Sequence, residues 1–223
     1  MKLPIFFLLF FSILCADPVE DLKKQVCDAI PNCYGWCTKE KAVSFIDLVL
    51  EVKPELCVEI GAFGGRSVLP VAAALKFLDQ GLLVAIDPWS KEEALRYLDP
   101  IKDLAHYNWW AKVNYEQIYQ SCLHVISQNG LEDYVITLRS TSEYAAPAIG
   151  MIDILYFDGN HSEIASVKDA KLYLPKVRPG GYIWINDALW SDMQAALDLI
   201  AETCDFVKWV DNGNCILFRK RAT

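Results

Sequence analysis

The sequence predicts an α/β fold: an open, doubly wound sheet of seven mostly parallel strands with an antiparallel C-terminal hairpin. Short apolar runs alternate with amphipathic stretches from residue 19 onward, as in strands joined by helices. A glycine-rich turn, GAFGG at 61–65, follows the first apolar run. The last two strand-like runs flank Asp211-Asn212-Gly213-Asn214, which is typical of a hairpin turn. Ligands of such sheets bind at the carboxyl ends of the strands.

The periodicity assigns each element in order. Apolar residues at helical spacing predict helices over 19–30, 39–52, 66–79, 113–130, 162–177 and 190–203, with a shorter one over 141–148. Pro70 is compatible with a first helical turn, and Asn129-Gly130 closes a helix. Apolar runs predict strands over 56–60, 82–86, 134–140, 152–158, 182–187, 206–210 and 215–220. Pro179-Gly180-Gly181 predicts a turn before the fifth strand.

The first sixteen residues, MKLPIFFLLFFSILCA, predict a signal peptide that ends at Ala16. The apolar run is shorter than the roughly 20 residues that span a bilayer. An uncleaved membrane anchor and a buried N-terminal helix are the alternatives. We therefore expect an exported protein, secreted, periplasmic or anchored by residues 1–16, while a cytoplasmic location stays open. Membrane contact would be confined to that segment. Residues 17–55 would form helices that cover a site in the domain over 56–223.

The charge balance bears on partners. The chain has 223 residues, with 21 Lys+Arg against 29 Asp+Glu, and a formal net charge of −8. An acidic surface argues against nucleic acid, because phosphate contacts need a basic one. The 53% hydrophobic and 22% charged residues exclude a disordered chain. A small-molecule ligand and a homodimer both remain compatible with these totals.

Eight cysteines are present, and Cys15 would leave with the signal peptide. Cys27, Cys33 and Cys37 are the candidates for disulfides, because export permits oxidation. Their spacing and the lack of a nearby His disfavour zinc. Cys57 and Cys215 lie in apolar runs and are predicted to be buried thiols.

Unusual residues follow the first two predicted strands. The first strand ends in VEIGAFGGRS, where glycines allow a sharp turn and a close ligand approach. The second strand ends at Asp87, placed to accept hydrogen bonds from ribose hydroxyls, and Trp89 could stack on a purine. A plain turn, a capping Asp and a core Trp are the structural alternatives. A dinucleotide fingerprint is missing, because Phe63 stands where its second glycine belongs.

These residues resemble the class I S-adenosylmethionine (SAM)-dependent methyltransferases, closest to the small O-methyltransferases of the catechol type and the sugar and antibiotic type. The match runs from about Glu59 to Asp187. It implies a Rossmann-like methyltransferase fold over 56–223 and SAM as cofactor. By this resemblance Glu59, Gly61, Phe63, Gly65 and Ser67 frame the methionine portion, Asp87 holds the ribose, and Thr141 and Ser142 line the adenine. Ala62, Pro88, Trp89 and Asp158 complete the predicted cofactor site.

Two later strand ends carry the other half of the predicted site. Asp158-Gly159-Asn160-His161 follows one strand and Asn186-Asp187 the next. Oxygen ligands from adjacent strand ends suit a hard cation, magnesium (Mg²⁺) above all. In the resembling enzymes these positions hold a metal, matched here by Asp158, Asn186 and Asp187. His161 stands where catechol-type enzymes carry a lysine and is the candidate general base beside Asp158. The structural alternatives are a turn at Asp158-Gly159, a helix cap at His161 and a plain strand end at Asn186-Asp187.

The sequence therefore predicts a SAM-dependent methyltransferase that methylates a hydroxyl of a small acceptor, with divalent-metal assistance left open. The aromatic segment 89–115, with Tyr107, Trp109 and Trp110, would form a lid or substrate wall, or else part of the core. The alternatives are an exported non-catalytic module that retains the fold and, less favoured, an NAD-dependent reductase. The non-catalytic module is considered because SAM is made in the cytosol, so an exported methyltransferase would lack an obvious supply of it.

Overall fold

A computed structural model describes residues 17–102 and 104–222 of the chain. The predicted signal peptide lies outside these residues. The helices are α1 (Pro18–Ala29), α2 (Lys39–Val52), α3 (Val68–Leu78), α4 (Lys91–Leu95), α5 (Leu104–Trp110), α6 (Tyr115–Gln128), α7 (Ser142–Ala145), α8 (Glu163–Tyr173) and α9 (Gln194–Thr203). The strands are β1 (Leu56–Ile60), β2 (Leu82–Asp87), β3 (Val135–Arg139), β4 (Ile152–Phe157), β5 (Val177–Ile185), β6 (Cys204–Val210) and β7 (Cys215–Lys220).

Within the described residues the strands form one seven-stranded sheet in the order β3-β2-β1-β4-β5-β7-β6. The pairs among β1 to β5 are parallel, whereas β7 runs antiparallel to both β5 and β6. The strand order reverses between β1 and β4, which is where doubly wound sheets bind ligands. The predicted fold class is confirmed.

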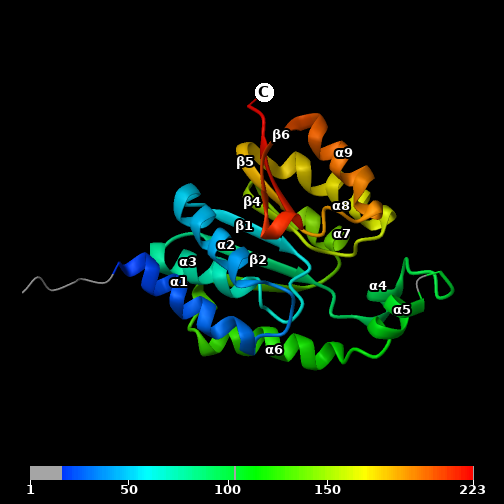
Figure 1. Cartoon of the computed structure of the whole chain (residues 1–223), viewed down its shortest axis with the longest axis horizontal. Helices are drawn as coiled ribbons and strands as arrows, with labels where there is room; N and C mark the ends of the chain where they lie inside the picture. The colour runs from blue at the N-terminus through cyan, green and yellow to red at the C-terminus, as the bar shows by residue number, and fades with distance from the viewer. Residues whose placement is uncertain (1–16, 103, 223) are drawn as a thin grey trace, which may run out of the picture.

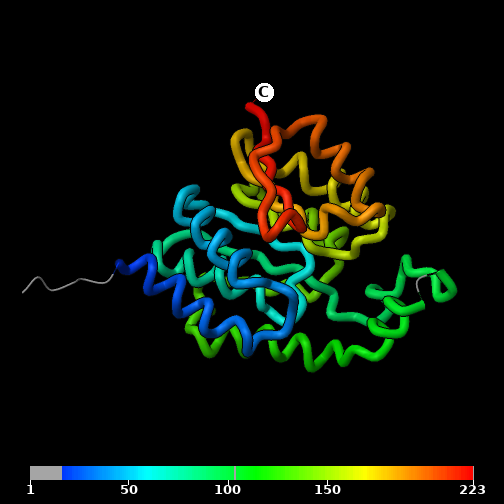
Figure 2. Tube along the Cα trace, viewed as in Figure 1, coloured from blue at the N-terminus to red at the C-terminus, as the bar shows by residue number. Residues whose placement is uncertain are grey.

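Helices cover both faces of the sheet, and each face has its own hydrophobic core. Buried side chains of α1, α2, α3 and α6 form one core with Trp184 and Tyr156 from the sheet. Those of α8 and α9 form the second core against Val58, Leu155 and Ile183. Figure 1 shows the two layers of helices, with the short helices α4 and α5 set apart near one end of the sheet. The tube view gives the same arrangement (Figure 2).

The parallel register brings four strand ends into one row. Ile60 pairs with Ile86 on one side and with Phe157 on the other, and Phe157 pairs with Ile185. The next residues continue the ladder: the amide of Gly61 donates to Ile86 O, that of Asp158 to Ile60 O and that of Asn186 to Phe157 O. The residues that follow β1, β2, β4 and β5 therefore face one another across a short distance.

Several boundaries differ from the sequence expectation. Pro179-Gly180-Gly181 lies inside β5, where the expected turn is instead an irregular register: Ile152 pairs with Val177 but Ile154 with Tyr182. Gly180 has φ +79°, which lets the chain bulge without leaving the sheet. The segment 89–115 contains α4 and α5, which hydrophobic spacing did not reveal because neither has a buried residue. The remaining helices agree with the prediction to within a few residues.

The cysteines correct one expectation. Cys27, Cys33 and Cys37 are free thiols, as are the other cysteines of the described part of the chain. Burial raises the pKa of Cys37 to about 12. Cys57 and Cys215 are fully buried, as predicted. Among residues 17–102 and 104–222, none of the helices has the length and apolar character needed to cross a membrane.

Candidate active site

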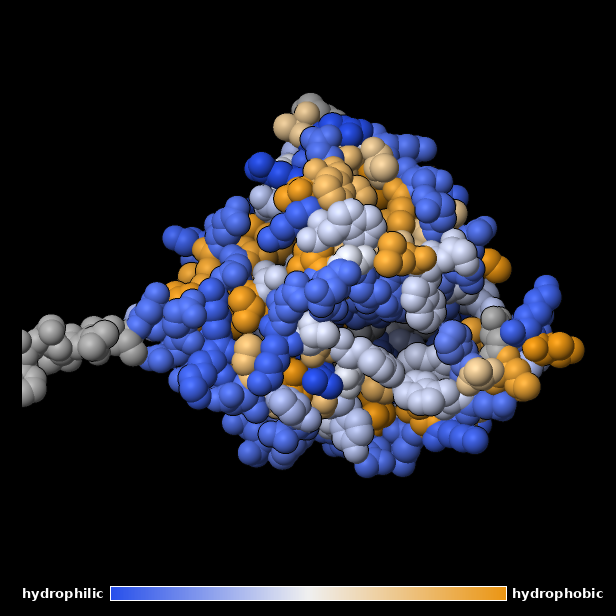
Figure 3. Space-filling view, viewed as in Figure 1, coloured by the Kyte–Doolittle hydropathy of each residue, from blue (hydrophilic) through white to orange (hydrophobic). Residues whose placement is uncertain are grey.

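A cavity of about 970 Å³ opens at the carboxyl ends of the parallel strands. Figure 3 shows its mouth as a hollow in one face of the molecule. Of the predicted site residues, those that line it are Gly61, Ala62, Phe63, Ser67, Asp87, Pro88, Thr141, Ser142, Asp158, His161, Asn186 and Asp187. The loop 34–38 and Lys41 contribute a further wall from the N-terminal segment.

The turn after β1 is shaped for close packing of backbone on backbone. Gly61 has φ +91°, and a Cβ on it would lie 1.9 Å from the carbonyl oxygen of Asp158. A Cβ on Gly64 would lie 2.4 Å from Cβ of Tyr34, in the N-terminal loop that crosses this turn. Arg66 fastens that loop by donating to Gly35 O at 2.9 Å. The glycines thus permit both the approach of β4 and a bare backbone floor for a ligand.

Glu59 lies beneath this floor and does not line the cavity. Its side chain is only 1% exposed, and Oε2 has no hydrogen-bond partner. Burial raises the pKa of Glu59 to about 8, with a hydrogen bond from Ser67 as the main opposing influence. A buried carboxyl oxygen without a partner at a strand end is a candidate acceptor for a hydrogen-bond donor of a ligand. Gly65, also predicted to frame the ligand, packs against Cys122 of α6 instead.

Asp87 ends β2 and organises the next turn. Its carboxylate accepts the amide of Phe63 at 3.0 Å and that of Trp89 at 2.7 Å. Burial raises the pKa of Asp87 to about 6, although both hydrogen bonds lower it. A carboxylate oxygen accepts more than one hydrogen bond, so Asp87 keeps acceptor capacity toward the cavity.

The side chain of Trp89 has a structural role, which corrects the expected stack on a purine. Trp89 is 2% exposed and packs against Tyr119, with ring centroids 4.6 Å apart. Its indole N–H donates to Phe63 O at 2.8 Å. Phe63 and Trp89 both have positive φ, 43° and 42°, uncommon for residues other than glycine. The Trp89 side chain therefore braces the strained glycine-rich turn from behind.

Thr141 and Ser142 begin α7 beside the end of β3. Thr141 caps the helix by accepting the amide of Tyr144 at 3.3 Å. Ser142 donates to Asp169 of α8, whose pKa burial raises to about 6. These residues line the end of the cavity next to β2.

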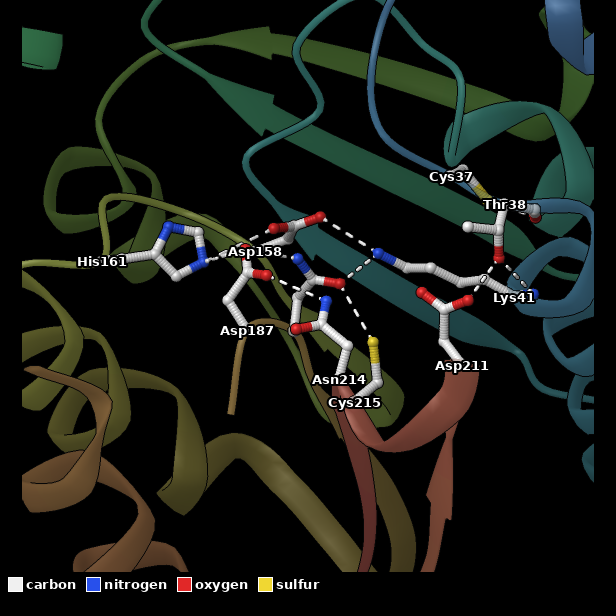
Figure 4. Close-up of polar contacts among 10 residues, drawn as sticks. Cys37, Thr38, Lys41, Asp158, His161, Asp187, Asp211, Asn214 and Cys215 are labelled. Carbon is white, nitrogen blue, oxygen red and sulfur yellow. Dashed lines mark hydrogen bonds and ion pairs between the residues drawn. The ribbon is translucent and has the colours of Figure 1, made fainter. Parts of the chain in front are cut away.

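Two carboxylates and an imidazole meet after β4 and β5. His161 Nε2 lies 3.2 Å from Asp187 Oδ2 and 3.7 Å from Asp158 Oδ1. Figure 4 shows the three side chains converging. The ring of His161 also contacts Trp190, with centroids 5.2 Å apart. One ligand atom from each of Asp158, His161 and Asp187 lies within 4.8 Å of the others, close enough for a shared proton or an ion.

Lys41, from the first turn of α2, approaches the same group from the other side (Figure 4) and was not singled out by the sequence. Its side chain is 3% exposed, and Nζ lies 3.6 Å from Asp158 Oδ2. Nζ also donates to Oδ1 of Asn186, which accepts from the Cys215 thiol at 3.1 Å as well. Burial alone would lower the pKa of Lys41, but the Asp158 carboxylate raises it above its usual value.

This contact engages one member of the predicted metal set, Asn186. The only side-chain oxygen of Asn186 is occupied by Lys41, and its amide donates to Asp187 Oδ2 at 2.8 Å. Asp158, Asn186 and Asp187 therefore do not present a set of free oxygen ligands. Asp158, His161 and Asp187 are the group that the structure brings together instead.

An aromatic wall, defined as Trp36, Phe63, Trp109 and Trp110, also lines the cavity. The Trp36 ring lies 5.1 Å from Phe63 and 5.3 Å from Trp109, centroid to centroid. Trp36 is 61% exposed and Trp109 45%. The wall is therefore a rim of the cavity and not part of the core. Segment 89–115 supplies two of its rings, and Tyr107 is not among the residues that line the cavity.

The strand order, the glycine floor and the acidic strand ends define the Rossmann-like fold of the class I SAM-dependent methyltransferases. Residues 58–188 match a family described as a methyltransferase domain, and the chain belongs to this family. A search of curated proteins finds no match.

Solved structures with this fold include several methyltransferases. The O-methyltransferase TomG from Streptomyces achromogenes, involved in tomaymycin synthesis and solved with SAM, is 15% identical, with a TM-score of 0.60 over 95% of this chain and 93% of that one. An O-methyltransferase from Bacillus cereus in complex with S-adenosylhomocysteine (SAH) is 14% identical, with a TM-score of 0.60 and 94% coverage of both chains. A methyltransferase from Geobacter sulfurreducens is 15% identical, with a TM-score of 0.58 over 95% and 92%.

Proposed function

We propose that this protein is a SAM-dependent O-methyltransferase that acts on a small hydroxylated acceptor. The observation that carries the proposal is the cavity itself. A bare backbone floor at Gly61, an acidic ribose acceptor at Asp87 and a proton acceptor at His161 all line it, within a methyltransferase fold. Family membership supports methyl transfer, and the site chemistry supports oxygen as the atom that is methylated.

The described residues fit SAM. Gly61 and Ala62 line the cavity, so a ligand can lie close to the backbone of this turn. Asp87 has acceptor capacity for ribose hydroxyls, and Thr141 and Ser142 would flank the adenine. The unpartnered Oε2 of Glu59 lies beneath the part of the floor assigned to the methionine portion. When bound, SAM supplies an electrophilic methyl group on a sulfonium.

The chain's own residues would prepare the acceptor. As its oxygen attacks the methyl carbon, the acceptor hydroxyl gives its proton to the imidazole of His161, which lines the cavity. Bound SAM would supply the methyl group: its S–CH₃ bond would give way to the new O–CH₃ bond, the electron pair would stay on sulfur, and SAH would be left. Asp187, 3.2 Å from Nε2, stabilises the imidazolium that results. The aromatic wall keeps water from the reacting atoms and orients the acceptor.

Mg²⁺ does not fit the residues that the resemblance assigned to it. Asn186 is engaged by Lys41, and an ammonium lies 3.6 Å from the Asp158 carboxylate. A dication about 4 Å from this ammonium would be repelled by about 8 kcal/mol at an effective dielectric constant of about 20. No step is therefore assigned to a metal.

Two other functions deserve comparison. An NAD-dependent reductase needs a second glycine in the turn, whereas Phe63 stands there and its amide is held by Asp87. A non-catalytic module would keep the fold without turnover. The site argues against decay, because the strand-end residues remain hydrogen-bonded to one another.

The proposal is tested by turnover. The purified chain is incubated with SAM and, in separate reactions, with a phenolic, a catecholic, a sugar or an amine acceptor, and mass spectrometry follows SAH together with a product heavier by one methyl group. We expect both products with at least one acceptor class, and neither with Asp87→Ala. Methylation of an amine but not of any hydroxylated acceptor would contradict O-methylation, and absence of both products with every acceptor would favour the non-catalytic module.

A further inference from the structure

Lys41 is a buried cation at the end of the sheet where the metal was expected. It is 2% exposed, although it belongs to the first turn of a helix. Lysine is almost never fully buried unless it is paired. Its partners are Asp158 Oδ2, at 3.6 Å, and Oδ1 of Asn186. Both residues belong to the predicted metal set, so the ammonium lies where a metal ion would contact both of them.

The fold holds this ammonium in place through the start of α2. The hydroxyl of Thr38 accepts the backbone amide of Lys41 at 3.0 Å and caps the helix. Thr38 in turn donates to Asp211, in the turn before β7. The side chain of Lys41 then runs past the ring of Phe45, with Nζ 5.8 Å from the ring centroid. Figure 4 shows the chain of contacts from Asp211 through Thr38 and Lys41 to the strand ends.

The neighbouring groups leave a position for an oxyanion. Asp158 Oδ1 and Asp187 Oδ2 face His161, while Asp158 Oδ2 and Asn186 Oδ1 face Lys41. Lys41, His161 and Asp158 all line the cavity. An ammonium carries three donors, and its contacts account for two of them. A fixed positive charge with a spare donor stabilises negative charge that develops on an acceptor oxygen.

We propose that Lys41 replaces the divalent cation: its ammonium, held by Asp158 and Asn186, stabilises the acceptor oxyanion, and the site does not bind a divalent metal. The oxyanion role rests on the proposed methyl transfer, whereas the exclusion of a metal does not. A neutral side chain at position 41 would release Oδ2 of Asp158 and Oδ1 of Asn186 as oxygen ligands beside the Asp187 carboxylate. The charge of Lys41 and a divalent ion are then mutually exclusive.

The test measures metal binding directly. Chelator-treated full-length protein is titrated with Mn²⁺, and electron paramagnetic resonance reports the free ion. We expect no site with a dissociation constant below about 1 mM in the wild type. Lys41→Met should bind Mn²⁺ at least about tenfold more tightly, and Lys41→Met combined with Asp187→Asn should lose that gain. Lys39→Met, an exposed neighbour on the same helix turn, is the matched control.

Several results would overturn the proposal. They are tight Mn²⁺ binding by the wild type that is lost in Asp187→Asn, or Mn²⁺ binding unchanged in a folded Lys41→Met. If Lys41→Met does not fold, Mn²⁺ binding by the wild type and by Asp187→Asn alone decides whether the site takes a divalent metal. SAH binding is measured in parallel and should change less than about threefold in Lys41→Met. Absence of SAH binding in the wild type would refute the proposed function while leaving the metal result readable.

Discussion

Glu59 offers a prediction about stability that follows from one buried carboxyl. Its pKa is raised from 4.5 to about 8, because the group is buried and Oε2 lacks a partner. Between these two values the folded protein keeps the proton, whereas the unfolded chain releases it. The free energy of unfolding should therefore fall as pH rises, by about 1.4 kcal/mol per pH unit from this group.

Glu59→Gln removes the titration and keeps the shape of the side chain. From pH 5 to pH 8 the wild type should lose roughly 3.5 kcal/mol that the variant retains, slightly less than three units at about 1.4 kcal/mol each because Glu59 is half ionised at pH 8. The free energy of unfolding of Glu59→Gln, relative to that of the wild type, should therefore rise by this amount between pH 5 and pH 8. Urea denaturation of the ligand-free protein at pH 5, 6.5 and 8 measures it.

Glu51→Gln, on the exposed side of α2, is the matched control for the loss of a carboxylate. Its difference from the wild type should not follow the same course with pH. If the Glu59→Gln difference stays constant to within about 1 kcal/mol from pH 5 to pH 8, the folded protein does not hold a proton on Glu59, and the reasoning fails.

Three further substitutions test the site. Gly61→Ala should destabilise the protein by about 3 kcal/mol or more in urea denaturation, because its Cβ would clash with the Asp158 carbonyl. Gly150→Ala, with open space around it, should destabilise the protein far less. Equal losses of stability in the two variants would refute the tight turn at Gly61. Trp36→Ala should raise the acceptor KM roughly tenfold with the KM for SAM unchanged, whereas Trp209→Ala, at an exposed position on β6, should change neither. A change in the KM for SAM alone would show that Trp36 contacts SAM and not the acceptor. His161→Gln should lower kcat by about 10²-fold or more without loss of SAH binding, and an unchanged kcat would exclude it as the base.

The strand ends could be predicted because their signals are local. Gly61 and Asp87 each follow an apolar run directly, and parallel pairing then brings their positions together without further information. The irregular start of β5 could not be foreseen, because Pro179-Gly180-Gly181 is equally compatible with a turn or a bulge. Pairing with β4 decides between the two.

Lys41 escaped prediction because its partner Asn186 lies 145 residues away in the sequence. A signal was nevertheless present. Lys41, Phe45, Leu48 and Val49 follow the spacing of one helix face, and the last three are apolar. A cation on the apolar face of a helix needs a buried partner, and the acidic strand ends were the candidates.

Trp89 shows the opposite failure. Its place two residues after Asp87 suggested a ligand contact, but φ of +42° turns the side chain back into the core. The backbone angle of a residue other than glycine in the left-handed region depends on the hydrogen bonds around it, here to Asp87 and Phe63. Such angles are not encoded in local sequence patterns.

Calorimetric titration of the full chain with SAH tests the central claim most directly, since it requires no knowledge of the acceptor. The wild type should bind one SAH per chain, and Asp87→Ala should weaken binding at least tenfold, because hydrogen bonds to a charged acceptor contribute about 1.5–3 kcal/mol each. Asp198→Ala, an exposed carboxylate of α9, controls for charge and should bind as the wild type does. Absence of binding to the wild type, or equal affinity in a folded Asp87→Ala, would contradict the account.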